Sequence, residues 1–275
     1  MEAASTARDS VLCFQRVSLS FNDTVALQDV SFEIGRGETR VILGEAGSGK
    51  SVLLKASQGL LKPDSGRICV FGTDITAMDE VHLYDIRSRI GVLFQEGGLF
   101  DSLTIDENVS YPLRNQPRHH DKVRDVENRV REALRFVELE HTMEKVPSEL
   151  SGGMRRRVGI ARATVTQPEL FLYDSPTAGL DPITANTIIA LIVRARDVRH
   201  TASAIATHRF QDGHMLANFR YNSQSGDLTK VPEGGESDTR TRFMVMREGR
   251  LVFEGTEREL YASRDPYVMK FAVRR

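Results

Sequence analysis

The stretch "VILGEAGSGKSVLLKA", residues 41–56, carries the pattern G-x-x-x-x-G-K-[ST] between an apolar run and a helical pattern. Glycines in this pattern let backbone N–H groups turn towards a polyphosphate, and the helix that follows adds its dipole. Lys50 places a cation on the outer phosphates, and Ser51 offers a hydroxyl to Mg²⁺. An accidental glycine-rich turn would need neither the strand nor the helix. The stretch therefore predicts a nucleoside triphosphate site made of Gly44, Glu45, Ala46, Gly47, Ser48, Gly49, Lys50 and Ser51.

Short β-branched runs and helical patterns alternate on both sides of this stretch. Such alternation favours an α/β domain with a largely parallel sheet. We find no internal repeat. Strands are expected at 11–19, 29–34, 39–43, 67–71, 90–94, 169–174, 202–207, 242–247 and 250–254.

Helical patterns dominate from about 104 to 165 and interrupt the strands. Within this block, "NQPRHHD" is expected to be an exposed turn, and 121–138 an amphipathic surface helix. The apolar positions of that helix are Val123, Val126, Val130, Ala133, Leu134 and Val137. We therefore expect one domain, with 1–98 and 166–275 as its core and 99–165 as an inserted helical subdomain.

The stretch "NSQSGDLTKVPEGGESDTR", 222–240, is poor in apolar residues and rich in turn formers. It is expected to be a loop, or a protruding hairpin followed by disorder. With its neighbours it forms an extra segment, 216–241.

The composition of the chain limits the classes of partner and the cellular compartment that we expect for it. A formal net charge of -1 gives no reason to expect nucleic acid. Cys13 and Cys69 follow neither a metal-ligand nor a disulfide-rich spacing, which suits a reducing compartment. The N-terminus has no apolar leader, and apolar runs such as "IIALIV" at 188–193 are far shorter than the roughly 20 residues that span a bilayer. The chain is thus expected to be cytosolic, with any membrane role supplied by a partner.

The stretch "FLYDSPTAGLD", 171–181, runs an apolar strand into an acid. Asp174 at the strand end fits a group that holds Mg²⁺ through water. A second acid normally follows the first in strands of this kind, and Ser175 stands in that place.

Further motifs occur in a fixed order along the chain. They are "SLSFND" with Phe21, "FQEGGLF" with Gln95, "ELSGGMRRR" with Ser151, Gly152 and Gly153, "AGLD" with Asp181, and "AIATHRF" with His208. With the phosphate loop, this set resembles the nucleotide-binding subunits of ABC transporters over nearly all of the chain. The resemblance implies the P-loop ATPase fold of that family, with an N-terminal antiparallel β part and an inserted helical subdomain.

The resemblance also implies a role for each motif. Gln95 would sense Mg²⁺, His208 would touch the γ-phosphate, and Phe21 would stack on adenine. The Ser151–Gly153 turn would close over the γ-phosphate held by a second subunit, with Asp181 at the seam. Each match also has a plainer interpretation: a polar loop residue for Gln95, a strand-end histidine for His208, and core packing for Phe21.

Details within the family are similar to the ATPases of Mla and Mce lipid-transport systems. These details are "FQEGGLFDSLTIDENVSYPLR", the methionine of "LSGGMRRR" and the ending "DPYVMKFA". The implied partners are a membrane permease, a second copy of the chain and an Mce/Mla-like lipid-binding component, and the implied location is the inner face of the cell membrane. Leu99, Phe100 and Leu103 would dock the permease, or would be packing within the helical block.

Three features depart from the family pattern: Ser175 in place of glutamate, Arg209 where aspartate often follows the histidine, and the segment 216–241. A serine hydroxyl cannot act as a base near neutral pH, and general acid–base assistance is worth about 10²- to 10⁴-fold. Glu96 and Asp181 are the nearest substitute carboxylates by motif position. Three functions therefore compete: a transporter motor, a soluble ABC protein of translation or DNA repair, and an ATP-binding scaffold with degenerate catalysis.

Overall fold

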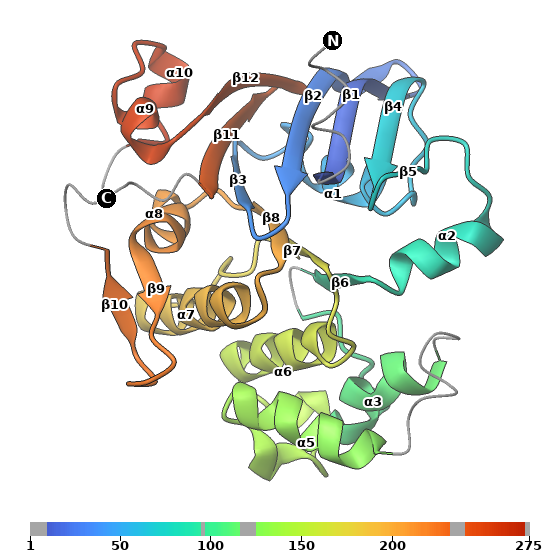
Figure 1. Ribbon diagram of the computed structural model, residues 1–275, viewed down its shortest axis with the longest axis vertical. Coiled ribbons are helices and arrows are strands. Elements are labelled where there is room, and N and C mark those ends of the chain that lie inside the picture. The colour runs from blue at the N-terminus through green and yellow to red at the C-terminus, as the bar shows by residue number, and fades with distance from the viewer. Residues whose placement is uncertain (1–9, 95–96, 116–124, 232–239, 273–275) are drawn as a thin grey trace.

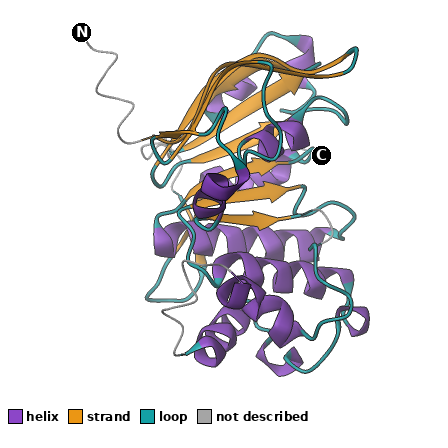
Figure 2. Ribbon diagram, turned by 90° about the vertical axis from the view of Figure 1, so that its right-hand side faces the viewer, coloured by secondary structure: helices purple, strands orange, loops and turns teal. Residues whose placement is uncertain are grey.

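The computed structural model describes residues 10–94, 97–115, 125–231 and 240–272. An antiparallel sheet near the N-terminus lies above a second, larger sheet, and a layer of helices lies below it (Figure 1). The view in Figure 2 gives the same sequence of layers from the side. The chain is therefore built as two stacked sheets with helices on the outer face of the second.

The larger sheet has six strands in the order β12-β11-β3-β8-β7-β6. Neighbours from β11 to β6 run parallel, and β12 pairs antiparallel at the edge. The predicted parallel sheet is thus confirmed. Because β3, β8 and β7 are neighbours, the loops that follow them meet at one edge of the sheet. The bounds are β3 Thr39–Leu43, β6 Ile90–Leu93, β7 Leu170–Asp174, β8 Ala202–Ala206, β11 Thr241–Arg247 and β12 Arg250–Gly255.

The smaller sheet is antiparallel, in the order β2-β1-β4-β5. Its strands are β1 Ser10–Phe21, β2 Thr24–Gly35, β4 Ser65–Val70 and β5 Thr73–Asp74. Strand β2 begins five residues before the predicted 29–34. The sequence pattern missed β5, because two residues are too few to display an alternation.

Helices form the lower layer and the rims. The predicted 121–138 helix is confirmed as α5 over 126–136, with Val130, Ala133 and Leu134 buried; Val123 and most of the "NQPRHHD" turn lie outside the described residues. The helices are α1 Lys50–Ala56, α2 Glu80–Arg87, α3 Ile105–Asn115, α5 Val126–Phe136, η2 Glu140–Thr142, η3 Pro147–Glu149, α6 Gly152–Thr164, α7 Pro182–Arg199, α8 Phe210–Asn218, α9 Glu257–Tyr261 and α10 Pro266–Met269. None of the helices in the described ranges combines the length and apolar character needed to cross a bilayer.

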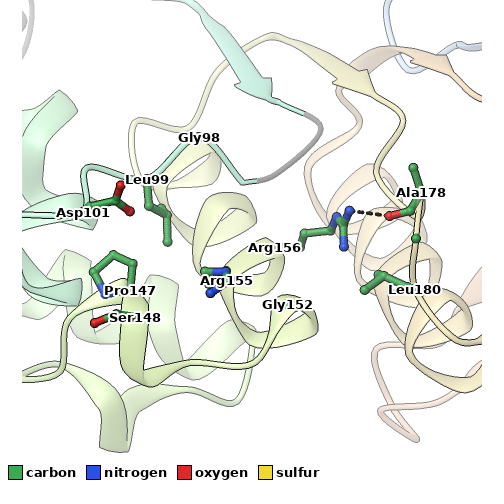
Figure 3. A pocket seen from close by; sticks show the side chains of 11 residues that line it. Gly98, Leu99, Asp101, Pro147, Ser148, Gly152, Arg155, Arg156, Ala178 and Leu180 are labelled. Atoms are coloured by element: carbon green, nitrogen blue, oxygen red, sulfur yellow. Dashed lines mark hydrogen bonds between the residues drawn. The ribbon is translucent and has the colours of Figure 1, made fainter.

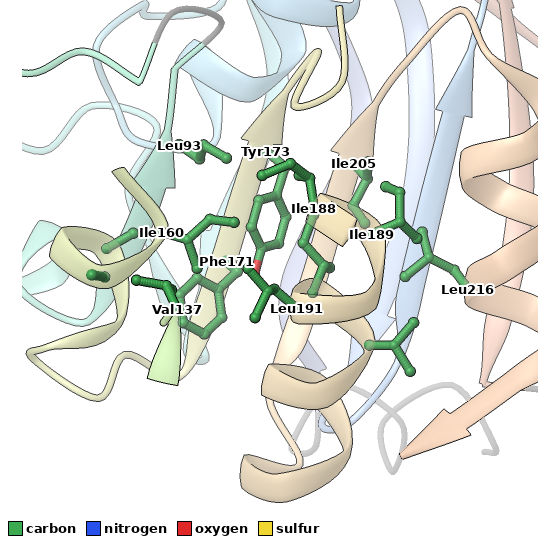
Figure 4. Close-up of a cluster of buried hydrophobic side chains, with 14 of the residues drawn as sticks. Leu93, Val137, Ile160, Phe171, Tyr173, Ile188, Ile189, Leu191, Ile205 and Leu216 are labelled. Atoms are coloured by element: carbon green, nitrogen blue, oxygen red, sulfur yellow. The ribbon is translucent and has the colours of Figure 1, made fainter. Parts of the chain in front are cut away.

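Strand β7 supplies both hydrophobic cores. Phe171 and Tyr173 point towards α6 and α7, where they meet Ile160 and Ile188 (Figure 4). Leu170 and Leu172 point to the opposite face, into the core shared with the antiparallel sheet. This alternation is what a strand buried on both faces requires. The core on the helical side is continuous from the sheet into α3, α5 and α6, so the helical block is fixed relative to the sheet.

The segment after α8 forms a hairpin, which is one of the two alternatives expected from the sequence. Strand β9, Phe219–Tyr221, pairs with β10, Leu228–Lys230. Two residues of α7 hold it: the buried Arg196 donates to the Phe219 carbonyl at 3.1 Å, and the partly buried Asp197 carboxylate accepts from the Tyr221 N–H at 2.9 Å. The hairpin thus lies against α7. The remainder of the predicted disordered stretch, 232–239, lies outside the described residues.

Candidate nucleotide site

The phosphate loop lies between the buried strand β3 and α1. Its shape depends on glycine: a Cβ on Gly44 would come within 2.6 Å of the Met246 carbonyl, and one on Gly49 within 2.6 Å of the Ala26 carbonyl. Gly49 also has φ 103°, a left-handed conformation that L side chains avoid. The two glycines therefore let the loop pack against β2 and β11 while it turns into the helix.

Lys50 is folded back onto the loop. Its Nζ donates to the carbonyls of Gly44 and Glu45, both at 2.7 Å. Burial lowers the pKa of Lys50, and the nearby Asp174 carboxylate partly opposes that shift. A polyphosphate would offer this ammonium stronger acceptors than the two neutral carbonyls.

A cavity of about 350 Å³ opens beside the loop. It lies at the edge where the carboxyl ends of β3, β7 and β8 meet. The residues around it include Ala46, Gly47, Gly49, Lys50 and Ser51 from the loop, Ser175 after β7, and His208 after β8. The fold therefore brings the phosphate loop, Ser175 and the predicted histidine into one space.

Ser175 adopts an uncommon backbone conformation in this cavity, with φ 51°. Its N–H donates to the Ala206 carbonyl at 2.8 Å, and its Oγ lies 3.4 Å from Asp174 Oδ1. Ser51 lines the cavity, and the Asp174 carboxylate lies beside Ser175, which also lines it; both side chains offer oxygen ligands. Mg²⁺ needs only one or two protein oxygens because it keeps several waters, so this donor set fits the ion. No group of three or more His, Cys, Asp or Glu that could hold a metal occurs in the described part of the chain.

Asp212 joins the two loops that carry Ser175 and His208, and the sequence analysis missed it. Its Oδ2 accepts hydrogen bonds from Thr177 at 2.6 Å and from Thr207 at 2.7 Å. All three side chains are at most 2% exposed. Burial raises the pKa of Asp212, against the opposing effect of these hydrogen bonds and of Arg209. The two threonines, one beside each loop residue, are the sequence signal that could have pointed to it.

The Ser151–Gly153 turn lies at a second cavity, not at the one beside the phosphate loop. Ser151 caps α6 by accepting from the Met154 N–H at 3.2 Å, and Gly152 lines a cavity of about 830 Å³ together with Leu99, Arg155 and Leu180 (Figure 3). Arg156 closes one end of it by donating to the Ala178 carbonyl. Within one chain, the turn and the phosphate loop thus line separate cavities.

The remaining residues predicted from the sequence lie outside the 350 Å³ cavity or outside the described residues. Phe21 ends β1 at a hairpin turn, is 45% exposed, and is not among the residues that line the 350 Å³ cavity. Asp181 caps α7 by accepting from the N–H groups of Ile183 and Thr184, each at 3.0 Å, and hydrogen bonding to Thr184 lowers its pKa. Gln95 and Glu96 lie outside the described residues.

Comparison with known proteins gives a consistent result. The family model "ABC transporter" matches residues 27–178. The methionine import ATP-binding protein MetN of Bifidobacterium longum is 34% identical over 95% of this chain and 61% of its own length. A probable ribonucleotide transport ATP-binding protein of Mycobacterium leprae is 41% identical over 69% of this chain and 54% of its own. The chain therefore spans little more than half the length of these two relatives.

One relative and one solved structure match at nearly full length. The intermembrane phospholipid transport ATP-binding protein MlaF of Haemophilus influenzae is 30% identical over 90% of this chain and 85% of its own. A dimeric structure of the ATP-binding cassette MJ0796, bound to ADP and Pi, has a TM-score of 0.73 at 27% identity and covers 89% of this chain and 98% of its own.

Proposed function

This chain belongs to the family of ABC transporter ATP-binding domains, and we propose that it binds ATP with Mg²⁺ and hydrolyses it as the motor of a membrane transporter. The cavity that Lys50 and Ser51 share with Ser175 and His208 carries the proposal. Phosphoryl transfer depends mostly on positioning and on charge stabilisation. Lys50 and His208 are the groups that would supply both at the outer phosphate.

Ser51 and Asp174 would hold Mg²⁺, the first directly and the second through water. Gln95 would complete this set from the loop after β6. The ion would neutralise charge on the phosphates. Lys50 would leave the carbonyls of Gly44 and Glu45 and donate to phosphate oxygens instead.

Two copies of the chain would form the working unit. The Ser151–Gly153 turn lines a cavity other than that of the phosphate loop, which supports a nucleotide held between the phosphate loop of one chain and the turn of another. A helix start with small residues suits an anion there. The dimeric MJ0796 structure with ADP and Pi supports a homodimer.

A group of exposed aromatic residues would dock the permease. Phe94, Phe100 and Tyr111 are 46%, 42% and 41% exposed, and the rings of Phe100 and Tyr111 lie 4.7 Å apart. Large apolar side chains gathered at a surface mark an interaction site. Leu99 is partly buried against the core of the helical block, so Phe100 is the better candidate of the two.

A phospholipid cargo is the finer part of the proposal. MlaF of H. influenzae corresponds to this chain over 85% of its own length, whereas MetN of B. longum extends well beyond the match. The partners would then be a permease and an Mce/Mla-like lipid-binding component, and the chain would lie on the inner face of the cell membrane.

A scaffold that binds ATP and hydrolyses it slowly is the second candidate, and Ser175 favours it. The loop around Ser175 keeps its hydrogen bonds to Ala206 and, through Thr177, to Asp212. Such a site retains its geometry and lacks the base.

The test is to purify the chain with the membrane protein encoded beside it and to measure Mg²⁺-dependent ATP binding, phosphate release and the lipid content of the complex. We expect tight binding, slow turnover and copurifying phospholipid. Wild-type chain that fails to bind MgATP would refute the motor and the scaffold alike. Turnover that responds to methionine and not to phospholipid would refute the cargo.

A further inference from the structure

The C-terminal segment, residues 257–271, packs against the phosphate loop from outside the cavity. It contains α9 and α10, which follow β12 (Figure 1). Val268 is 1% exposed and anchors α10 in the core. Tyr267 and Phe271 pack on the same core, with their rings edge to face at 5.4 Å. This segment is therefore fixed to the domain at the point where it meets the loop.

Tyr267 supports the first turn of the loop. Its hydroxyl donates to the Met246 carbonyl at 3.1 Å, and the hydroxyl oxygen accepts a long hydrogen bond, at 3.5 Å, from the Glu45 N–H. The Met246 carbonyl is also the atom against which Gly44 packs. Tyr267 thus connects β11 with the two residues that open the phosphate loop.

Lys270 forms an ion pair with the loop. Its Nζ lies 3.3 Å from Glu45 Oε1, and both side chains are about 60% exposed. Arg247 and Lys270 flank the Tyr267 ring, at 5.1 Å and 5.3 Å from its centre. Exposed ion pairs contribute little to folding, so this pair has no evident role in stability.

The ion pair matters for ligand binding because one of its members, Glu45, is part of the phosphate loop. Glu45 belongs to the loop that would bind the polyphosphate, and its carboxylate would repel that ligand through the field of its charge even though the side chain does not line the cavity. Lys270 neutralises that carboxylate from the C-terminal segment, and Tyr267 holds the backbone that carries it.

We propose that Lys270 and Tyr267 are positioning residues of the nucleotide site, which make a phosphate loop containing Glu45 fit for a polyanion. This inference rests on the proposed ATP binding. It assigns to the C-terminal segment a direct effect on affinity for MgATP that acts through Glu45.

The experiment is a double-mutant cycle on the full-length chain, with MgATP affinity measured by calorimetry. In the wild-type background, Lys270→Gln should raise the dissociation constant by about threefold, as expected for loss of one exposed charge near a polyanion. In the Glu45→Gln background, the same substitution should change it by less than about 1.5-fold, because no carboxylate remains to be neutralised. Lys270→Arg should restore the wild-type value.

Matched variants distinguish the effect of Lys270 on Glu45 from a general effect of lost surface charge or lost stability. Lys145→Gln removes the same charge from an exposed position in the helical block and should leave the affinity unchanged. Tyr267→Phe keeps the ring, removes the hydroxyl and should weaken binding by a similar small factor with an unchanged melting temperature. An equal effect of Lys270→Gln in both backgrounds, or none in the wild type, would overturn the inference. Failure of the wild-type chain to bind MgATP would instead overturn the proposed function. The Lys50→Ala variant provides the calorimetric signal expected of a chain that does not bind MgATP.

Discussion

Ser175→Glu is expected to raise ATP turnover of the permease complex at least tenfold. Ser175 already lines the cavity with Lys50 and His208, so the longer side chain would extend into the space where the outer phosphate is expected. A positioned general base contributes about 10²- to 10⁴-fold, and an imperfect fit reduces that to about tenfold at the low end.

The substitution should cost little stability. Ser175 already has φ 51°, so the strain of a left-handed residue is present in the wild type and is not added. The new carboxylate would lie near Asp174, and a like-charge pair about 5 Å apart costs about 3 kcal/mol at an effective dielectric constant of 20. Lys50 lines the same cavity and offsets most of this, which leaves a loss of about 1 kcal/mol.

Phosphate release at saturating MgATP is the assay, and Ser175→Gln is the control. Glutamine has the size of glutamate and no basic oxygen, so the ratio of the two variants isolates the carboxylate. If the wild type already turns over rapidly, and if the glutamate and glutamine variants behave alike, the missing-base hypothesis is wrong. A substitute acid would then have to be sought, with Glu96→Gln and Asp181→Asn as the first variants.

Lys50→Ala should abolish MgATP binding or weaken it severely, since the ammonium offsets phosphate charge at close range; unchanged affinity by calorimetry would contradict the assignment. Phe100→Asp should release the permease while leaving ATP affinity intact, and retained copurification would contradict the docking surface. Deletion of 222–240 should spare ATP binding, because the hairpin lies against α7 and not at the cavity; a large loss of affinity would count against this. Because burial raises the pKa of Asp212 above its unfolded value, the wild type should lose free energy of unfolding as pH rises through the folded pKa. Asp212→Asn cannot ionise and should lack that decline in urea titrations carried upward from about pH 4, the ordinary pKa of aspartate.

The strands of the parallel sheet and the phosphate loop could be predicted from the sequence, because each depends on residues that are close together in the chain. A buried parallel strand needs apolar residues on both faces, and β3, β7 and β8 contain unbroken apolar runs at 41–43, 170–173 and 204–206. The phosphate loop needs glycine at close approaches, and Gly44 and Gly49 stand there. Adjacent strand ends then bring Ser175 and His208 to the loop with no further information.

Contacts between segments that are far apart in the chain could not be predicted from the sequence. Asp212 lies in the first turn of α8, four residues after His208, and nothing in the chain order shows that Thr177 and Thr207 both donate to its Oδ2. Lys270 is 225 residues from Glu45, and the contact exists because Val268 fits into a core built from other elements. The polar composition of the β9–β10 hairpin likewise gave no sign that Arg196 and Asp197 on α7 would hold the backbone of β9.

The replacement at Ser175 therefore has a narrow physical meaning. A degenerating site would be expected to lose the groups that hold its shape, because each costs stability when buried. In this chain the Ser175 N–H donates to the Ala206 carbonyl, and Thr177 donates to Asp212 at 2.6 Å. Two threonine hydroxyls satisfy the buried Asp212 side chain, which offsets the cost of burying it. The loop around Ser175 is therefore held in place, and if Ser175 stands where the family resemblance implies a glutamate, the effect should appear in the rate of the chemical step, with ATP binding left intact.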